Sequence, residues 1–405
     1  MFFSPVLSKR RILLGICGGV ALYKACEVIR LLKKEGAEVK VVLSTGAEKF
    51  ASPLLFSALT GEKTYINEDF FEASGAIPHI ELARWPELIL ILPATASFLS
   101  KLRCGQASEL LLALLLATKA PVYLFPSMNT AMLEHPATQE NIKNLRSYGY
   151  LVYEPAKGEL ACGERGKGRL PEPEEILELV KAHFKPKDLL GKKILITGGP
   201  TREYLDQVRF ITNASSGKTA LFLLKEAYYR GGEIYFIWGG GQINLLLPRL
   251  DYTHNIPYPR IITVSTTEEM LERAKEIFPE VNIAIFAAAP CDFRPKKIYP
   301  GKIKKKEEME LSLELTPDIA KTLSTLKSHQ LTVGFALEER EKLSFYARTK
   351  KKEKAFDWLI ANPIETIGAD ISDYFILGPD FEREYKGISK EELAKKLFDL
   401  ILEIS

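Results

Sequence analysis

Two stretches of the chain begin in the same way, and this shared opening constrains the fold more than any other feature. In "RRILLGICGGVALYKACEVIRLLKKEG" (10–36), an apolar strand pattern leads through a glycine turn into a helix with apolar residues three and four apart. The segment "KKILITGGPTREYLDQVRFITNASSGKTALFLLKEAYYRGG" (192–232) repeats this order with a longer connection before its helix. A short apolar strand follows each opening, at 39–43 and 233–238. The pattern predicts two similar α/β units.

Strands and helices keep alternating in both halves. Further apolar strands are predicted at 87–92, 121–125, 282–286, 331–335 and 358–361. Apolar strands between helices indicate parallel sheets covered on both faces. The seam "HFKPKDLLGKK" (183–193) combines proline, lysines and glycine, so we place a boundary near Leu190. We expect two doubly wound, Rossmann-like α/β domains, 1–190 and 191–405.

Charge and cysteine content exclude several classes of protein. The net charge of +3 over 405 residues is too small to argue for nucleic acid or a membrane surface as a partner. The longest apolar run, "LLLALLLA" (110–117), is far shorter than the ~20 residues of a membrane-spanning helix, so we expect a buried helix. Five cysteines without a CxxC pair, and no pattern typical of a signal peptide, predict a cytoplasmic protein.

Neither opening contains the GxGxxG dinucleotide fingerprint. Each is still a glycine turn before a helix N-terminus, which favours an anionic group. Glycine turns are common in any α/β fold, so this feature alone leaves phosphate binding open.

Six short motifs make the first half specific. In order they are "GICGGVALYKA" (15–25), "STGAEKF" (44–50), "HIELARW" (79–85), "PATASFLSK" (93–101), "PSMNTAM" (126–132) and "ACGERGKGRL" (161–170). Together they resemble the flavin-dependent cysteine decarboxylases, specifically phosphopantothenoylcysteine decarboxylase, over nearly all of residues 10–182. The resemblance implies a flavodoxin-like domain that uses FMN to oxidise a cysteine thiol, so that the neighbouring carboxylate can leave as CO2.

The same resemblance assigns roles to three residues. His79 is implied to assist thiol activation, for which its near-neutral intrinsic pKa is suited, although a histidine near a helix start is often polar surface. Asn129 follows the strand 121–125 and is implied to bind substrate, although it can also serve as a helix N-cap. Cys162 is implied to give a proton to the ene-thiol from a glycine-rich flap; the alternative is a passive exposed thiol.

The candidate flavin-binding residues lie in the glycine turn and at strand ends, where a threonine is also a common cap. They are Gly18, Gly19, Ser44, Thr45, Phe50, Ala94, Thr95 and Thr118. Two departures from the family pattern stand out: "ASEL" (107–110) where members commonly carry ANDL, and "ACGE" (161–164) where they commonly carry ACGD.

The second half resembles phosphopantothenate–cysteine ligase over most of residues 191–380. The resemblance rests on the opening at 196–220 and on "AAAPCDFRP" (287–295), "GKIKK" (301–305), "TPDIA" (316–320), "GFALE" (334–338) and "ARTKKKEKAFDWLIAN" (347–362). It implies that the carboxylate of 4′-phosphopantothenate is activated by CTP, with Mg²⁺, as an acyl-cytidylate, and that the amine of cysteine then displaces CMP. In bacteria this ligase is typically fused behind the decarboxylase.

By resemblance, Arg209 and Asn213 handle the acyl-cytidylate and Lys302 stabilises charge in the second step. Lys350 and Lys354 are four apart on a predicted helix and so share one face, although a lysine run is usually a solvated surface. The implied nucleotide-binding residues are Ser215, Ser216, Gly217, Ala288, Ala289, Asp292, Lys302, Pro317, Asp318, Ile319, Ala320, Phe335, Lys350 and Lys354. Metal ligands are left unassigned. Pro290–Cys291, the proline of "IANP" (360–363) and "SSGKTA" (215–220) depart from the usual pattern.

Together the two halves predict a bifunctional enzyme of coenzyme A biosynthesis. Its partners are expected to be 4′-phosphopantothenate, cysteine, CTP and further copies of itself, with trimeric decarboxylase contacts and dimeric ligase contacts that a dodecamer would satisfy. One alternative is a regulatory binding subunit, which the retained His79, Asn129 and Cys162 disfavour. Another is a flavin prenyl- or peptide-modifying relative, which the ligase half and "PSMN" disfavour.

Overall fold

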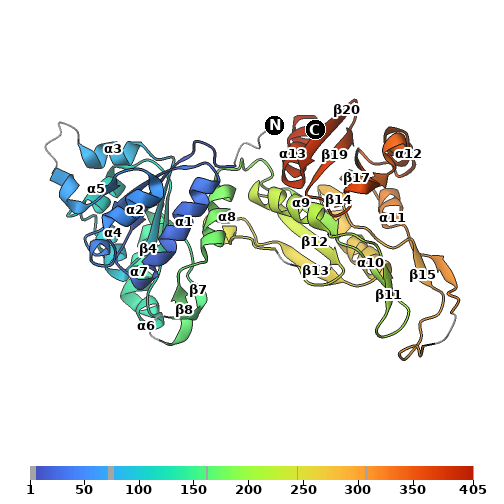
Figure 1. Cartoon of the computed structure of the whole chain (residues 1–405), viewed down its shortest axis with the longest axis horizontal. Helices are drawn as coiled ribbons and strands as arrows, with labels where there is room; N and C mark the ends of the chain where they lie inside the picture. The colour runs from blue at the N-terminus through green and yellow to red at the C-terminus, as the bar shows by residue number, and fades with distance from the viewer. Residues whose placement is uncertain (1–5, 72–76, 161–162, 244, 306–308, 405) are drawn as a thin grey trace. The chain divides into compact units, whose positions relative to one another are not determined.

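The computed structural model describes residues 6–71, 77–160, 163–243, 245–305 and 309–404 (Figure 1). Backbone contacts divide the chain into two compact units. The first comprises residues 1–184 together with Leu246–Asn255, and the second comprises Lys185–Leu245 and Ile256–Ser405. The chain therefore returns to the first unit for a short segment within the second half of the sequence.

The first unit is built on a parallel sheet with strand order β3-β2-β1-β4-β5-β6. This is the doubly wound arrangement predicted from the sequence, and the direction of winding reverses between β1 and β4. The predicted strands at 39–43, 87–92 and 121–125 are confirmed to within two residues. The strands are β1 (Arg11–Ile16), β2 (Glu38–Leu43), β3 (Thr64–Tyr65), β4 (Leu88–Ala94), β5 (Val122–Pro126) and β6 (Leu151–Val152).

Helices cover this sheet in two groups. In the first group, α1 contacts α2 and α8. In the second group, α3 contacts α5, and α4 contacts α7. In α1, the residues Ala25, Val28, Ile29 and Leu32 are spaced three and four apart and all are buried. The predicted buried helix at 110–117 is confirmed as α5. The helices are α1 (Tyr23–Lys34), α2 (Pro53–Thr60), α3 (Pro78–Arg84), α4 (Ala96–Arg103), α5 (Leu110–Ala117), α6 (Thr130–Glu134), α7 (Pro136–Ser147) and α8 (Pro173–His183).

Two smaller features complete the first unit. The strands β7 (Ala156–Glu159) and β8 (Arg165–Arg169) pair antiparallel as a hairpin. In the segment Leu246–Asn255, the backbone N–H of Arg249 donates to the hydroxyl of Tyr153 at 2.8 Å, and Leu250 is fully buried.

The second unit contains an eight-stranded sheet in the order β13-β12-β9-β14-β17-β18-β19-β20. It is parallel from β13 to β18, as predicted, but β19 and β20 are antiparallel additions that the sequence pattern did not indicate. Winding reverses between β9 and β14. The strands are β9 (Lys193–Gly198), β12 (Glu233–Gly239), β13 (Arg260–Val264), β14 (Ile283–Phe286), β17 (Leu331–Glu338), β18 (Trp358–Pro363), β19 (Ile371–Leu377) and β20 (Glu382–Ser389).

One core of this unit packs α10, α11 and α12 against the sheet, while α9 contacts α13. The helices are α9 (Lys218–Tyr229), α10 (Thr267–Ile277), α11 (Ile319–Thr325), α12 (Leu343–Glu353) and α13 (Lys390–Ile404).

Two short hairpins in the second unit lie side by side, and Figure 1 shows them extending from the sheet. They are β10 (Arg202–Tyr204) with β11 (Phe210–Thr212), and β15 (Phe293–Pro295) with β16 (Leu313–Leu315).

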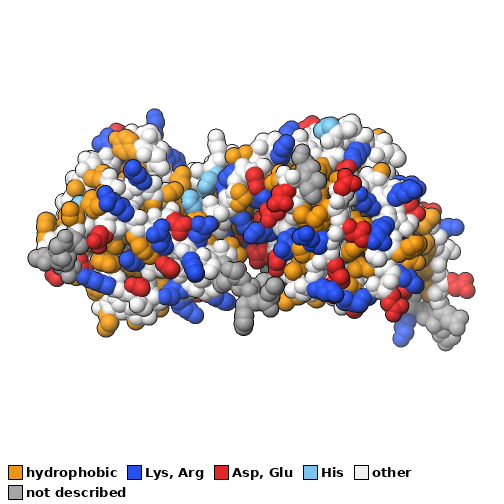
Figure 2. All heavy atoms as spheres, turned by 90° about the horizontal axis from the view of Figure 1, so that it is seen from above, with side chains coloured by type: hydrophobic (Ala, Val, Ile, Leu, Met, Phe, Trp, Pro, Cys, Tyr) orange, Lys and Arg blue, Asp and Glu red, His pale blue; other side chains and the backbone are white. Residues whose placement is uncertain are grey.

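On the face shown in Figure 2, basic and acidic side chains are interspersed.

Candidate active sites

The first candidate site lies at the carboxyl edge of the first sheet, where winding reverses between β1 and β4. Such crevices are where open α/β sheets bind ligands. The predicted flavin residues Gly18 and Gly19 follow β1, Ser44 and Thr45 follow β2, and Thr95 follows β4. These five predicted positions are thus brought to this edge by the topology, together with Ala94 at the end of β4 and Phe50, which is exposed just after a short helical turn.

The loops after β1 and β2 touch through glycines. A Cβ added to Gly18 would lie 2.4 Å from the carbonyl carbon and oxygen of Gly46, so a side chain there would force the two loops apart. By contrast, a Cβ on Gly19 would make only ordinary contacts, 3.6 Å from Thr95 and 3.7 Å from Pro93. Gly18 is therefore required by packing, whereas Gly19 leaves open backbone at the edge.

The predicted residue Thr45 is held by a buried carboxylate that sequence reasoning missed. The backbone N–H and the hydroxyl of Thr45 donate to Glu109 Oε2 at 3.2 and 3.0 Å, and Lys101 Nζ lies 2.5 Å from Glu109 Oε1. Burial alone would raise the pKa of Glu109, but the bonds from Lys101 and Thr45 outweigh it, and the pKa lies below its ordinary value. Glu109 thus stays ionised and fixes the loop after β2.

Two predicted threonines have structural partners. Thr95 is the N-cap of α4, and its hydroxyl accepts from Phe98 N at 3.3 Å, which leaves its backbone at the sheet edge. Thr118 is not brought to this edge: it lies before β5, and its hydroxyl donates to the carbonyl of Ala83 at 2.8 Å. The cap at the end of α5 explains Thr118 without a flavin.

The sequence pattern predicts that His79 stands just before a helix, but His79 is the second residue of α3. Its ring meets Phe70 edge-on, with centroids 5.3 Å apart. Its Nδ1 atom is buried and has no hydrogen-bond partner among the described residues. A buried ring nitrogen without a partner is costly, so His79 is prepared to bond a group that binds at the site.

Asn129 follows β5 and has both expected properties. Its Oδ1 accepts from Ala131 N at 2.8 Å, so it caps α6, and its Nδ2 donates to Glu164 Oε2 at 2.7 Å. Glu164 is the last residue of the "ACGE" motif, and this bond places it next to "PSMN". Cys162 lies outside the described residues.

The second candidate site is a cavity of about 380 Å³ beside β14, β17 and α12. Nine of the residues predicted to bind the nucleotide line it, although they come from four separate parts of the sequence. They are Ala288, Asp292, Pro317, Asp318, Ile319, Ala320, Phe335, Lys350 and Lys354. Apolar walls from Phe286, Phe356 and Leu359 would suit the faces of a base.

Both predicted lysines pair with carboxylates, of which Asp318 lines the cavity. Lys350 pairs with Glu338 at 2.5 Å, and Lys354 pairs with Asp318 at 2.9 Å. Burial alone would raise the pKa of Asp318, but a backbone bond from Lys321 and the Lys354 pair outweigh it and lower the pKa. Two oriented cations in a half-closed cavity can bind phosphate groups.

Asn213 is joined to the wall of the same cavity. Its Nδ2 donates to the carbonyl oxygens of Ala289 and Pro290 at 3.2 and 2.9 Å. The neighbouring Cys291, which departs from the family pattern, is buried, and burial raises the pKa of its thiol. It is a neutral packing residue here.

The predicted serines precede a helix start that requires glycine. Gly217 has φ +66° and caps α9, and a Cβ there would lie 2.2 Å from Trp238. Ser215 Oγ accepts from Gly217 N at 3.3 Å. Ser215 and Ser216 therefore lead directly into the N-terminus of α9, a helix of 12 residues.

Arg209 and the loop that carries Lys302 are tied together by Asp206, a second residue that was missed. Asp206 accepts from the backbone N–H groups of Val208, Arg209 and Ile303 at 2.7, 2.8 and 2.9 Å, and from Arg209 Nη1 at 2.6 Å. These bonds, the one from Ile303 above all, hold the pKa of Asp206 far below its ordinary value. Lys302 is exposed on this loop and does not line the cavity.

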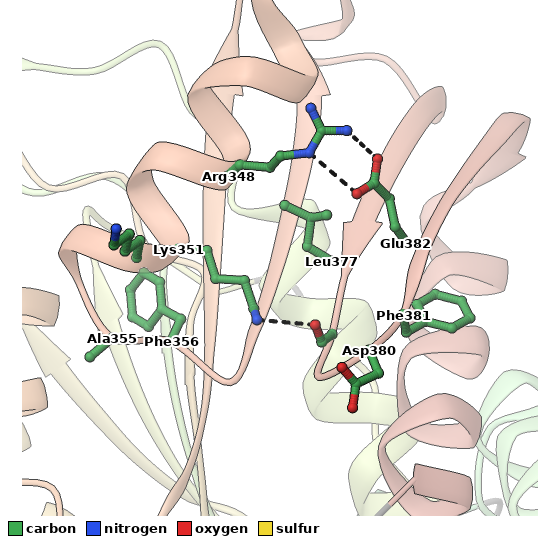
Figure 3. Close-up of a pocket in the computed structure, with 10 residues that line it drawn as sticks. Arg348, Lys351, Ala355, Phe356, Leu377, Asp380, Phe381 and Glu382 are labelled. Atoms are coloured by element: carbon green, nitrogen blue, oxygen red, sulfur yellow. Dashed lines mark hydrogen bonds and ion pairs between the residues drawn. The ribbon is translucent and has the colours of Figure 1, made fainter.

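A larger cavity, about 630 Å³, lies on the other side of α12 and contains none of the predicted residues. Figure 3 shows Arg348 paired with Glu382, and Lys351 reaching the carbonyl of Gly378 at 3.0 Å. Phe356 lines both cavities. Helix α12 thus carries lysines on both sides, and Lys350, together with the C-cap residue Lys354, faces the predicted nucleotide site.

Within the described ranges, no three His, Cys, Asp or Glu side chains gather in a way that could hold a metal ion. None of the described helices has the length and apolar content to cross a membrane.

Comparison with known proteins follows the same division of the chain. The family described as DNA/pantothenate metabolism flavoprotein C-terminal domain matches residues 189–404, and the family described as flavoprotein matches 4–185. The coenzyme A biosynthesis bifunctional protein CoaBC of Bacillus subtilis (strain 168) is 38% identical over 409 residues, covering 99% of this chain and 98% of its own. The chain belongs to the CoaBC family. The Escherichia coli (strain K12) CoaBC protein is 35% identical, covering 98% of this chain and 97% of its own.

Among solved structures, the C-terminal domain of a CoaBC protein is 31% identical and covers 54% of this chain and 97% of that chain, with a TM-score of 0.45. Membership of the CoaBC family decides between the expectations drawn from the sequence. The chain is a bifunctional enzyme of coenzyme A biosynthesis with decarboxylase and ligase activities. The flavoprotein match corresponds to the first unit without Leu246–Asn255, and the second match covers the second unit together with that segment.

Proposed function

We propose that the second unit joins 4′-phosphopantothenate to cysteine with CTP, and that the first unit decarboxylates the product to 4′-phosphopantetheine with FMN. The observation that carries the ligase assignment is the cavity of about 380 Å³, on which nine residues predicted from sequence converge. Chance would not bring four separated segments to one cavity with two lysines turned into it.

In the ligase reaction, a free carboxylate is a poor acyl group and is first converted to an acyl-cytidylate with release of pyrophosphate. Lys350 and Lys354 are proposed to exchange their carboxylate partners for the phosphates of CTP. Asn213, fixed on the cavity wall, is proposed to donate to the acyl or phosphoryl oxygen. Arg209 and Lys302, on the two joined hairpins, are proposed to stabilise charge while the amine of cysteine displaces CMP. No covalent enzyme residue is required; the work is positioning and charge neutralisation.

The first site fits FMN by two observations. The carboxyl edge of the sheet carries the open backbone of Gly19 and the fixed Thr45, and His79 offers a buried Nδ1 without a partner among the described residues. When bound, FMN supplies the two-electron oxidation that makes loss of CO2 feasible. Gly18, Gly19, Ser44, Thr45, Ala94 and Thr95 are proposed to hold it.

This chain's own residues then handle the substrate. Asn129 is proposed to bind the carboxylate and amide of 4′-phosphopantothenoylcysteine. His79 is proposed to take or orient the thiol proton, and Cys162 to supply the proton for the ene-thiol.

Mg²⁺ is expected to arrive with the phosphates of the nucleotide, as is usual for this ion. The described residues offer no cluster for it, and no step is assigned to it. A cytoplasmic homo-oligomer is also proposed, from the family resemblance alone.

Two measurements test these proposals. The purified chain should be yellow and show flavin absorbance, and protein that stays colourless after reconstitution with FMN would remove the assignment of the first unit. Given 4′-phosphopantothenate, the chain should release pyrophosphate faster with CTP than with ATP; equal turnover would remove the CTP assignment.

A further inference from the structure

The cavity of about 630 Å³ beside α12 is used by neither of the proposed reactions. Of its basic residues, Lys351 and Lys352 follow Arg348 by three and four positions, so all three share one face of the helix (Figure 3). Lys350 is two positions from Arg348 and so lies on the opposite face, where it lines the nucleotide cavity. Helix α12 therefore presents a separate set of cations to each of the two cavities.

The three cations have hydrogen-bond donors to spare. The guanidinium of Arg348 pairs with Glu382 through Nε, at 3.3 Å, and through Nη2, which leaves Nη1 without a partner among the described residues. Lys351 Nζ, which has three N–H groups, donates to Gly378 O at 3.0 Å. The ammonium of Lys352 has no partner among the described residues. Ammonium and guanidinium groups with spare N–H donors are the groups that bind phosphate oxygens.

Another wall of the cavity is a tight turn between β19 and β20. The N–H of Gly378 donates to Phe381 O at 2.8 Å, and a Cβ on Gly378 would lie 2.5 Å from the ring of Trp358. The turn is therefore fixed against the sheet. Its apolar side chains Leu377 and Phe381 line the cavity, so an apolar group can pack beside a charged one.

The charges of the lining favour an anionic ligand. Its acidic residues are Asp380 and Glu382, and Glu382 is already paired with Arg348. Among the described residues, the charges left without an ionic partner are the ammonium groups of Lys351 and Lys352 and the single carboxylate of Asp380. A phosphate group therefore gains more from the lysines than it loses to Asp380.

We propose that this cavity is a binding site for an organic phosphate, separate from the nucleotide cavity. The phosphate group binds the ammonium groups of Lys351 and Lys352 and the Nη1 of Arg348. The organic part packs on Leu377 and Phe381. The two cavities lie on opposite faces of α12, so both can be occupied at once, and the site exists whether or not the chain uses CTP.

Binding of phenyl phosphate to the FMN-loaded full-length chain tests the site. Titrations followed by phosphorus NMR are made in a Lys350→Ala/Lys354→Ala background, which removes the lysines proposed to bind phosphate in the nucleotide cavity. Lys352→Ala should raise the Kd of phenyl phosphate about tenfold, because a charge-assisted contact is lost. Asp380→Asn should lower that Kd about threefold, because it removes a repelling charge, and asparagine tolerates the backbone φ of +49°.

Two comparisons separate the site from general effects of charge. Inorganic phosphate should bind about threefold or more weakly than phenyl phosphate, and Phe381→Ala should remove most of this difference, because the phenyl ring packs on Phe381. Lys275→Ala is the matched control. Lys275 is also an exposed lysine in the last turn of a helix of the second unit, but it lines neither cavity, so both Kd values should stay unchanged.

An unchanged Kd in Lys352→Ala overturns the proposal, and so do shifts in the same direction in Lys352→Ala and Asp380→Asn, or equal binding of the two phosphates. The thermal unfolding midpoint of each variant should match its background, which shows that a changed Kd does not come from unfolding. A chain that binds phenyl phosphate in this way but releases no pyrophosphate from CTP would lose the ligase assignment and keep this site.

Discussion

The buried carboxylate of Glu109 provides the sharpest test of how the flavin loop is held. Glu109→Gln keeps the shape of the side chain and removes its charge. In the native protein this carboxylate receives both donors of Thr45 and lies 2.5 Å from Lys101 Nζ. In the variant, the amide oxygen can still accept from Thr45, but Lys101 loses its ionic partner.

The contacts set the magnitude. Hydrogen bonds to a charged group contribute about 1.5–3 kcal/mol, and neutral ones about 0.5–1.5 kcal/mol. The Lys101 side chain is 37% exposed, so solvent screens its contribution, and we count only the two Thr45 bonds. Their weakening, about 1–1.5 kcal/mol for each bond, should lower the free energy of unfolding of the first unit by about 2–3 kcal/mol. If the loop binds FMN and half of this loss, about 1.4 kcal/mol, is felt in binding, the Kd of FMN should rise about tenfold.

The pH dependence has a definite sign. Because the folded-state pKa of Glu109 is lowered, its contribution to stability is present above the unfolded-state pKa and is lost as pH falls through the folded-state pKa. The difference in unfolding free energy between wild type and Glu109→Gln should therefore be largest near neutral pH and shrink below about pH 4.

Urea unfolding followed by flavin release gives the measurement, because the flavin signal reports the first unit alone. Glu140→Gln is the matched control: Glu140 also pairs with a basic residue of α4, Arg103, but its side chain is 65% exposed against 8% for Glu109. Glu140→Gln should lower the free energy of unfolding by less than about 0.5 kcal/mol. The reasoning is refuted if Glu109→Gln binds FMN and unfolds like the wild type, or if the control loses as much stability.

Further predictions concern single contacts at both sites. Lys354→Ala should raise the KM for CTP about tenfold or more in a pyrophosphate-release assay, as loss of a charge-assisted phosphate contact predicts, whereas Lys352→Ala, on the other side of α12, should not. Asp206→Asn should lower ligase turnover while leaving CO2 release from 4′-phosphopantothenoylcysteine intact; a loss of both activities would indicate general unfolding. Gly168→Ala should abolish CO2 release but not pyrophosphate release, because the added methyl overlaps Met128 O, and an active variant would contradict the close contact between β8 and the residues after β5.

The sequence was sufficient for the parallel core of both sheets, because continuous apolar strands between amphipathic helices leave few alternatives. It did not indicate β19 and β20. The strand β20, "EREYKGIS", is mostly exposed and polar at the sheet edge, and its pairing with β19 is set by tertiary contact rather than by an apolar pattern.

The candidate sites also combine residues that a local sequence pattern predicts with residues that only tertiary contacts reveal. Lys350 and Lys354 were recognisable because their spacing places both on one side of a helix, and motif order supplied the rest of the nucleotide cavity. The two acidic residues that fix the loops of these sites, Glu109 and Asp206, were not recognisable from the sequence. Glu109 acts on Thr45 across 64 positions of sequence, and Asp206 reaches Ile303 across 97, so only the folded chain reveals the pairs. An acidic residue that departs from a family pattern, as in "ASEL" and "ACGE", was the one available signal.

The ten residues Leu246–Asn255 have a consequence for how the two activities could ever be separated. They are encoded within the ligase half, yet they complete the first unit, with Leu250 fully buried and Arg249 N bonded to Tyr153. A decarboxylase expressed as residues 1–190 would lack these ten residues and expose the apolar surface against which Leu250 packs. A piece long enough to include them would carry an incomplete ligase. A single cut near residue 190 would therefore leave the first unit without part of its core, although the second unit would keep nearly all of its own chain.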